Sequence, residues 1–327
     1  MVIALLLGSC SGDPDPAPLP ATSSARNTVA PVPAPRPRAT TKESGFRPPN
    51  EAERRLAIGD LDNLSDARRA VFEPAQDFSP VPAPGPSDWL ALHHEPGQSF
   101  AAYQAQGANL VSAQRRVLYV QPIGAQTRRV GLSRAEIKRF AATFFGLEVR
   151  YLPARAVEEF AASSRYVANR RQLLTGAVLS GLRAKVPDDA YAVIGLTTVD
   201  LYAGAGWNFV FGQASLRERI GVHSIARYFP SFYGDSDSGA ESLIRRRTLV
   251  VLAHEIGHMF GLQHCTHFHC IMNGSNGLGE TDSTPVHLCP VCLRKLDLAV
   301  HGLEHRRRYQ KLARFMHRHG LKDEASW

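Results

Sequence analysis

The chain has 327 residues, of which 44% are hydrophobic, and it carries a formal net charge of +8 at pH 7. This length allows one sizeable globular domain with appendages. The cations include short runs at residues 245–247 and 306–308, which are typical of solvated helix faces, so nucleic acid is not an expected partner. No segment beyond the N-terminal residues has the apolar length of a transmembrane span.

Residues 1–10, MVIALLLGSC, form a short apolar run that ends in two small residues before Cys10. The run resembles the lipobox of bacterial lipoproteins, in which this cysteine is lipidated after cleavage. No lysine or arginine precedes it, so a plain apolar tail is the alternative. We expect a cell-envelope lipoprotein tethered to a membrane through Cys10. The cytoplasm is the alternative location, because free thiolates are safest there.

Composition after residue 10 predicts a linker, a lead-in segment and a main domain. Residues 11–50 are rich in Pro, Ala, Ser and Thr with little to bury, which predicts a disordered linker. Residues 51–110 predict a lead-in segment of helices and irregular structure, with helices at 51–61 and 65–72 before a proline-rich stretch. The main domain is expected at residues 111–320.

Strands and helices alternate at the start of the main domain. Ser133 and Glu136 have capping-box spacing, and Gly146 is placed to end the helix that they begin. The expected order is strand 115–124, helix 133–146, strand 147–152, helix 170–186 and strand 190–201. This order predicts an α/β sheet with parallel strands.

Two further β-rich runs, 207–216 and 221–228, precede a long apolar helix at 243–260. A basic helix follows at 305–320. Its apolar residues recur at helical spacing, which favours packing on the domain over nucleic-acid binding.

The long helix carries the sequence HEIGH. His254 and His258 are four residues apart, so they project from one face of the helix and can reach one zinc ion at about 2.0 to 2.1 Å. Glu255 lies beside them, where its carboxylate can act as general base on a water molecule at the metal.

A third ligand requires the helix to break. His264 lies ten residues after His254, which on a continuous helix would place it about 15 Å along the axis. Gly261 can adopt the left-handed conformation that ends helices, so the chain can turn back and bring His264 under the ion. Three histidines leave a fourth position for water, as in a catalytic zinc site.

Four of the five cysteines fall within residues 265–292. This clustering favours metal binding over a disulfide framework. Two short loops each offer two thiolates to one tetrahedral zinc, which would be closed and structural; the four ligands are Cys265, Cys270, Cys289 and Cys292. We therefore expect two zinc ions per chain, one catalytic and one structural.

The pattern HExxHxxGxxH resembles the metzincin clan of zinc peptidases. The clan also has a methionine turn beneath the metal, for which Met272 is the candidate. The cysteine directly after His264, the LCPVC sequence and the segments PSDWLALHHEP, LYVQPIG, WNFVFGQASL, GVHSIARY and MNGSN are similar to the archaemetzincin family. The resemblance covers the chain from about Ser87 to Leu303.

This resemblance implies a metzincin-type zincin fold of the α/β class. Such a fold has a twisted mixed β-sheet, an active-site helix that carries the motif and a C-terminal helical part. It also implies peptidase activity at the three-histidine zinc and an edge strand at 207–216 that pairs with extended substrate. Some metzincins have a tyrosine two residues after the methionine, but Gly274 stands there in this chain.

We therefore expect a zinc metallopeptidase that acts on peptides or proteins as a monomer, with Glu255 as general base. The alternative is a non-catalytic, zinc-organised peptide-binding protein. A binding protein of this kind would need the same metal ligands, but a carboxylate beside the metal would serve no purpose in it. The presence of Glu255 therefore favours a catalytic role over binding alone.

Overall fold

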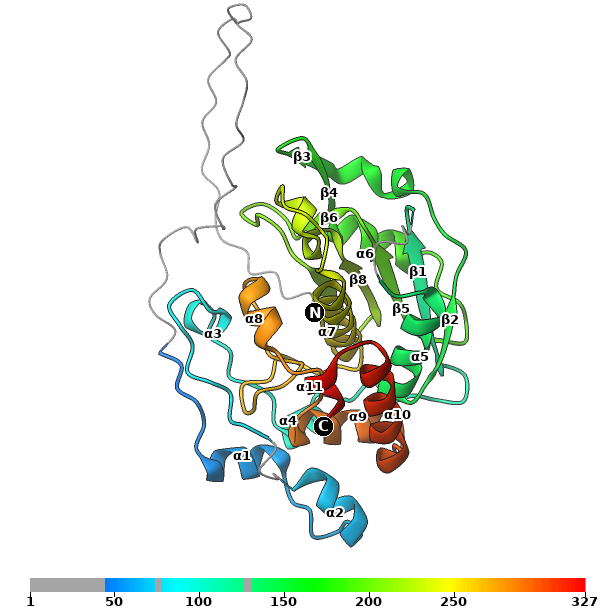
Figure 1. The fold of residues 1–327 in the computed structure, drawn as a ribbon. Coiled ribbons are helices and arrows are strands. Elements are labelled where there is room, and N and C mark those ends of the chain that lie inside the picture. Colours follow the sequence, from blue (N-terminus) through cyan, green and yellow to red (C-terminus); the bar gives the residue numbers. More distant parts are fainter. Residues whose placement is uncertain (1–44, 74–77, 126–130, 327) are drawn as a thin grey trace, which may run out of the picture.

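The computed structural model describes residues 45–73, 78–125 and 131–326. Its centre is a five-stranded sheet in the order β2-β1-β5-β8-β7 (Figure 1). Adjacent strands are parallel except β7, which pairs antiparallel with β8 at the edge. The strands are β1 (Val117–Ile123), β2 (Glu148–Tyr151), β5 (Ala190–Thr197), β7 (Gly212–Ala214) and β8 (Ile220–Ser224). The predicted mixed α/β class is confirmed.

Alternating side chains of β1 face two separate cores. Leu118 and Val120 belong to the larger core, while Val117 and Tyr119 belong to the smaller one. Helices α5 (Arg134–Phe145), α7 (Glu241–Met259), α9 (Pro290–Ala299) and α10 (His305–Arg318) contribute to the larger core, and α6 (Thr175–Arg183) contributes to the smaller one. The sheet is therefore covered on both faces, as the alternation of strands with helices requires.

Helix α5 follows its sequence signals closely. The Ser133 side chain accepts a hydrogen bond from the Glu136 amide, and the Glu136 carboxylate accepts one from the Ser133 amide. Gly146 ends the helix in the left-handed conformation, at φ 70°. The predicted capping box and glycine stop are both present.

The helix predicted over residues 170–186 is wrong in its first part. Residues there form β4 (Arg170–Leu174), which pairs with β3 (Ser164–Val167) and β6 (Asp200–Tyr202) in a second, three-stranded sheet. Ala168 and Asn169 both have positive φ, 47° and 62°, which is the backbone of a two-residue hairpin turn. Helix α6 begins only at Thr175.

Three other predicted strands differ at their ends. The run 190–201 is divided between β5 and β6, and only residues 212–214 of the run 207–216 pair in the main sheet. The run 221–228 ends as a strand at Ser224 and continues as the 3₁₀ helix η3 (Ala226–Tyr228). Two other 3₁₀ helices in the described part of the chain are η2 (Val157–Ser163) and η4 (Pro230–Phe232).

The lead-in segment packs against the C-terminal helices (Figure 1). It contains α1 (Glu51–Ile58), α2 (Asp66–Phe72), α3 (Trp89–Leu92) and α4 (Phe100–Ala105). Arg294 on α9 donates hydrogen bonds to the carbonyl oxygens of Ile58 and Asp60, and Arg68 on α2 pairs with Asp297 on α9. The short helices α8 (Leu278–Ser283) and α11 (Lys322–Ala325) complete the fold. None of the helices in the described ranges has the length and apolarity to cross a membrane.

Candidate active site

Helix α7 places His254 and His258 on one face, with their Nε2 atoms 3.0 Å apart. The Nδ1 atom of His254 lies 2.8 Å from the carbonyl oxygen of Ile271, and that of His258 lies 2.7 Å from the carbonyl oxygen of Leu262. A carbonyl oxygen can only accept, so each Nδ1 must carry the proton. Both Nε2 atoms then face each other as acceptors.

The chain turns back after α7, as the sequence requires. Helix α7 ends at Met259, and Gly261 has φ 85°, in the left-handed region. The turn brings His264 to the other two histidines, so that one ligand nitrogen from each lies within 4.8 Å of the others. The structure thus brings together the three predicted ligands, all of which are partly buried.

The third histidine has a partner that sequence reasoning missed. The Nδ1 atom of His264 lies 2.7 Å from Oε1 of Glu95, in the lead-in segment. Burial raises the pKa of the Glu95 carboxyl, but the hydrogen bond with His264, together with smaller effects of Trp89 and His93, leaves this pKa below its usual value. Glu95 belongs to the sequence PSDWLALHHEP, but nothing in its spacing connects it with a residue 169 positions away.

The chemistry of this cluster fits a divalent transition metal. Burial lowers the pKa of His254 to about 3 and that of His258 well below its usual value, so both rings are neutral. Two neutral rings with their Nε2 lone pairs 3.0 Å apart repel each other unless a cation lies between them and His264. Neutral imidazole is a preferred zinc ligand, and each Nδ1–H is already bonded as such ligands require.

Glu255 projects from the same helix into a buried position. Burial raises the pKa of its carboxyl to about 8, and its Oε2 atom has no hydrogen-bond partner among the described residues. A methyl group on Gly212, in the edge strand β7, would lie 2.6 Å from the Glu255 carboxyl carbon. The carboxylate therefore packs directly on the backbone of the edge strand.

Met272 packs against α7 at Gly257. It is fully buried, and a methyl group on Gly257 would lie only 2.4 Å from its sulfur atom. Its carbonyl oxygen accepts a 2.7 Å hydrogen bond from the Cys265 amide. This hydrogen bond joins the two ends of the segment 265–272, which directly follows His264.

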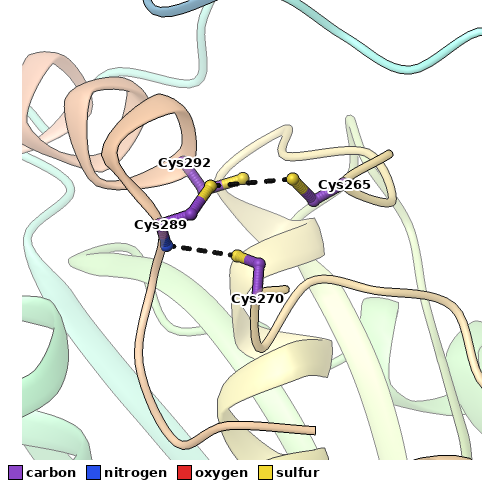
Figure 2. Close-up of side chains that lie close together, drawn as sticks. All are labelled: Cys265, Cys270, Cys289 and Cys292. Atoms are coloured by element: carbon purple, nitrogen blue, oxygen red, sulfur yellow. Dashed lines mark hydrogen bonds between the residues drawn. The ribbon is translucent and has the colours of Figure 1, made fainter. Parts of the chain in front are cut away.

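The four predicted cysteines form a second cluster, shown in Figure 2. Their sulfur atoms lie within 4.8 Å of one another, all four residues are buried, and none forms a disulfide. Sγ of Cys270 accepts hydrogen bonds from the amides of Met272 and Cys289, at 3.5 and 3.3 Å. Hydrogen bonds from the other thiols, Cys270 first, hold the pKa of Cys265 well below its usual value. Such a set suits a tetrahedral zinc with no open position.

Cys10 and residues 11–44 of the predicted linker (11–50) lie outside the described residues, so lipidation of Cys10 stays a prediction. Among the residues that the structure describes, the histidine and cysteine clusters are the two groups that could hold a metal ion.

Comparison with known proteins places this architecture in a family. The family model "Peptidase family M54" matches residues 146–298. "Archaemetzincin-2" from Homo sapiens is 36% identical over 277 residues, which cover 75% of this chain and 77% of that protein. "Archaemetzincin" from Thermococcus kodakarensis is 44% identical over 138 residues, covering 41% of this chain and 70% of that protein.

Solved structures are also similar. The crystal structure of archaemetzincin from Methanopyrus kandleri has 32% sequence identity and a TM-score of 0.45, and the match covers 57% of this chain and 95% of that protein. The "zinc-dependent peptidase" from Methanocorpusculum labreanum has 26% identity and a TM-score of 0.44, and the match covers 54% of this chain and 99% of that protein. Because the identity with archaemetzincin-2 extends over most of both proteins, this chain belongs to the archaemetzincin family, peptidase family M54, and is a zinc metallopeptidase.

Proposed function

We propose that the chain hydrolyses peptide bonds at a zinc ion held by His254, His258 and His264, with Glu255 as general base. The observation that carries this proposal is the pair of Nε2 atoms 3.0 Å apart, both forced to act as acceptors, beside a buried carboxylate. A site with only a structural role has no use for that carboxylate.

Zinc and Glu255 have different roles in the proposed hydrolysis. Zinc, when bound, supplies Lewis-acid activation of a water molecule and of the substrate carbonyl. Burial raises the pKa of the Glu255 carboxyl to about 8, and a cation held by the three histidines would favour the ionised, basic carboxylate. Glu255 accepts the proton of the attacking water and passes it to the leaving amine.

The edge strand β7 is the proposed place for the substrate backbone. It is the last strand of the main sheet and pairs with β8 on one side. An extended peptide added to such an edge gains main-chain hydrogen bonds with little sequence preference. The contact between Gly212 and the Glu255 carboxyl supports this proposal, because the proposed general base then lies beside the substrate backbone.

We also propose a second, structural zinc at Cys265, Cys270, Cys289 and Cys292. Cys265 follows His264 directly, and Cys289 and Cys292 lie at the start of α9. A zinc there would join the loop of the third histidine to the C-terminal helices.

Cleavage of a diverse peptide pool tests the proposed function. The zinc-loaded full chain, read by mass spectrometry, is expected to produce new internal cleavage products. Treatment with a zinc chelator should abolish them and added Zn²⁺ should restore them, with circular dichroism to confirm that the chain stays folded. Zinc-loaded, folded protein that cleaves nothing in the pool would contradict the proposal.

Gly212→Ala is expected to lower kcat by roughly tenfold without changing zinc content. The added methyl group would displace the Glu255 carboxylate, and small displacements of a reacting group are costly. Steady-state kinetics on one peptide from the pool measures this effect. The matched control is Gly176→Ala, where a methyl group meets nothing within 4 Å. Equal kcat values for the two variants would show that the Gly212 contact is unimportant.

A further inference from the structure

Residues 79–98, here called the strap, run along the loop of residues 261–276, here called the metal loop. Pro80 and Phe268 form an antiparallel bridge. On either side of it, the Val81 amide donates to the carbonyl oxygen of His267 at 3.4 Å, and the His269 amide donates to that of Ser79 at 3.0 Å. The strap thus begins as a short β-pairing with the metal loop.

The other end of the strap is fixed at the turn after α7. The buried Gln98 accepts a hydrogen bond from the Gln263 amide through Oε1 and donates one to the carbonyl oxygen of Gly261 through Nε2, both at 3.2 Å. Lys295 on α9 donates to the carbonyl oxygen of Gln98. Both ends of the strap are therefore anchored to the chain around His264.

Between these anchors the strap contacts His264 and the metal loop. The Trp89 ring contacts the His264 ring edge-on, with centroids 5.2 Å apart, and the Trp89 amide donates to Glu280 at 2.9 Å. Trp89 also lies where any side chain at Gly274 would be, because a methyl group there would lie 2.4 Å from its ring. The Oε1 atom of Glu95 meets Nδ1 of His264 at 2.7 Å.

The three histidines are held in different ways. His254 and His258 stand on helix α7, and neutral carbonyl oxygens accept from their Nδ1 atoms. His264 stands on a loop, and its acceptor is a carboxylate. A carboxylate behind a metal-binding histidine fixes the ring orientation and increases the basicity of the ligating nitrogen.

We propose that Glu95 is the positioning residue for His264, and that the anchors of the strap at Pro80 and Gln98 hold Glu95 against the His264 ring. The strap lies outside the residues 146–298 that match the family model. This inference rests on the proposed function, because it takes the three histidines as zinc ligands. Glu95 acts through His264 and touches neither substrate nor reacting atoms.

Competition with a chromophoric zinc chelator tests this role, with bound zinc counted by atomic emission. Glu95→Ala is expected to weaken zinc binding at the histidine site by about 10- to 100-fold. Glu95→Gln keeps an acceptor oxygen and loses only the charge, so its effect should be smaller. The cysteine site in the same molecule serves as the internal reference and should keep its zinc.

A spectroscopic measurement separates positioning from a general loss of stability. Co²⁺ bound at the histidine site has a visible spectrum that reports its ligand geometry, and Glu95→Ala should alter this spectrum. His94→Ala is the matched control, because His94 is the exposed neighbour of Glu95. It should leave the spectrum and the zinc affinity unchanged.

The outcomes distinguish this inference from the proposed function. Unchanged zinc affinity and an unchanged Co²⁺ spectrum in Glu95→Ala would overturn the role of Glu95, whether or not the wild type cleaves peptides. A Glu95-dependent affinity in a wild-type protein that cleaves nothing would leave the positioning role standing and remove the peptidase function. A histidine site that binds no zinc in the wild type would overturn both.

Discussion

Glu255→Gln is expected to lower kcat by at least about a hundredfold, the usual contribution of a general base. Glutamine has nearly the same shape, so it keeps the packing against Gly212, but it cannot accept a proton. Both zinc ions should remain, because Glu255 is not one of the clustered ligands. Initial rates on a peptide identified from the pool, with zinc counted in the same sample, measure both effects.

Glu241→Gln is the matched control for that change. Glu241 lies in the first turn of the same helix and is exposed, so its replacement should leave kcat within about twofold, as a surface substitution remote from the site should. If Glu255→Gln retained the wild-type kcat with two zinc ions bound, another group would have to be the base. Loss of zinc together with activity would instead assign Glu255 a role in metal binding.

The parts of the site that the sequence predicts are those set by local geometry. Residues four apart on a helix share a face, so the positions of His254 and His258 follow once α7 is recognised. Gly261 ends the helix for a local steric reason, and a positive φ is found there. The CxxC spacing of Cys289 and Cys292 at a helix start is equally local.

The contacts that sequence reasoning missed depend on the tertiary fold. Glu95 meets His264 across 169 positions, and Gly212 meets Glu255 through the packing of β7 on α7. No residue spacing encodes either contact. The prediction that an edge strand lies within 207–216 placed Gly212 in the right element, but it could not say which residue would face the base.

The misassigned helix at 170–186 has a similar cause. Residues 170–174 (RRQLL) are acceptable helix formers on local propensity. Pairing with β3 through the turn at Ala168 and Asn169, and parallel pairing with β6, outweighs that weak preference. Leu173 is fully buried in this strand, so tertiary packing decides the local structure.

Cys289→Ala is expected to remove one of two zinc ions and to lower the melting temperature by at least about 10 °C. Structural zinc contributes about 10 to 16 kcal/mol of apparent binding free energy in small zinc domains. Even a few kcal/mol of that shifts the melting temperature of a chain of this size by several degrees. Three thiols would also remain buried, with Sγ of Cys265 having lost its neighbour at 3.6 Å.

Loss of the zinc at the cysteine cluster should also disturb the histidine site. Cys265 adjoins His264, and Cys270 accepts a hydrogen bond from the Met272 amide, so a loosened cysteine cluster loosens the metal loop. Peptidase activity should therefore fall together with stability in Cys289→Ala, whereas Glu255→Gln should lower activity alone. Calorimetry and zinc analysis of the two variants side by side measure this difference.

Cys10→Ala is the matched control, because Cys10 is the one cysteine of the chain outside the cluster. It should keep two zinc ions and the wild-type melting temperature. A Cys289→Ala protein with two zinc ions and an unchanged melting temperature would show that the cysteine cluster holds no structural metal. The closeness of its four buried sulfur atoms would then come from side-chain packing alone, and the metal loop would be held by the strap and the hydrogen bond between Met272 and Cys265.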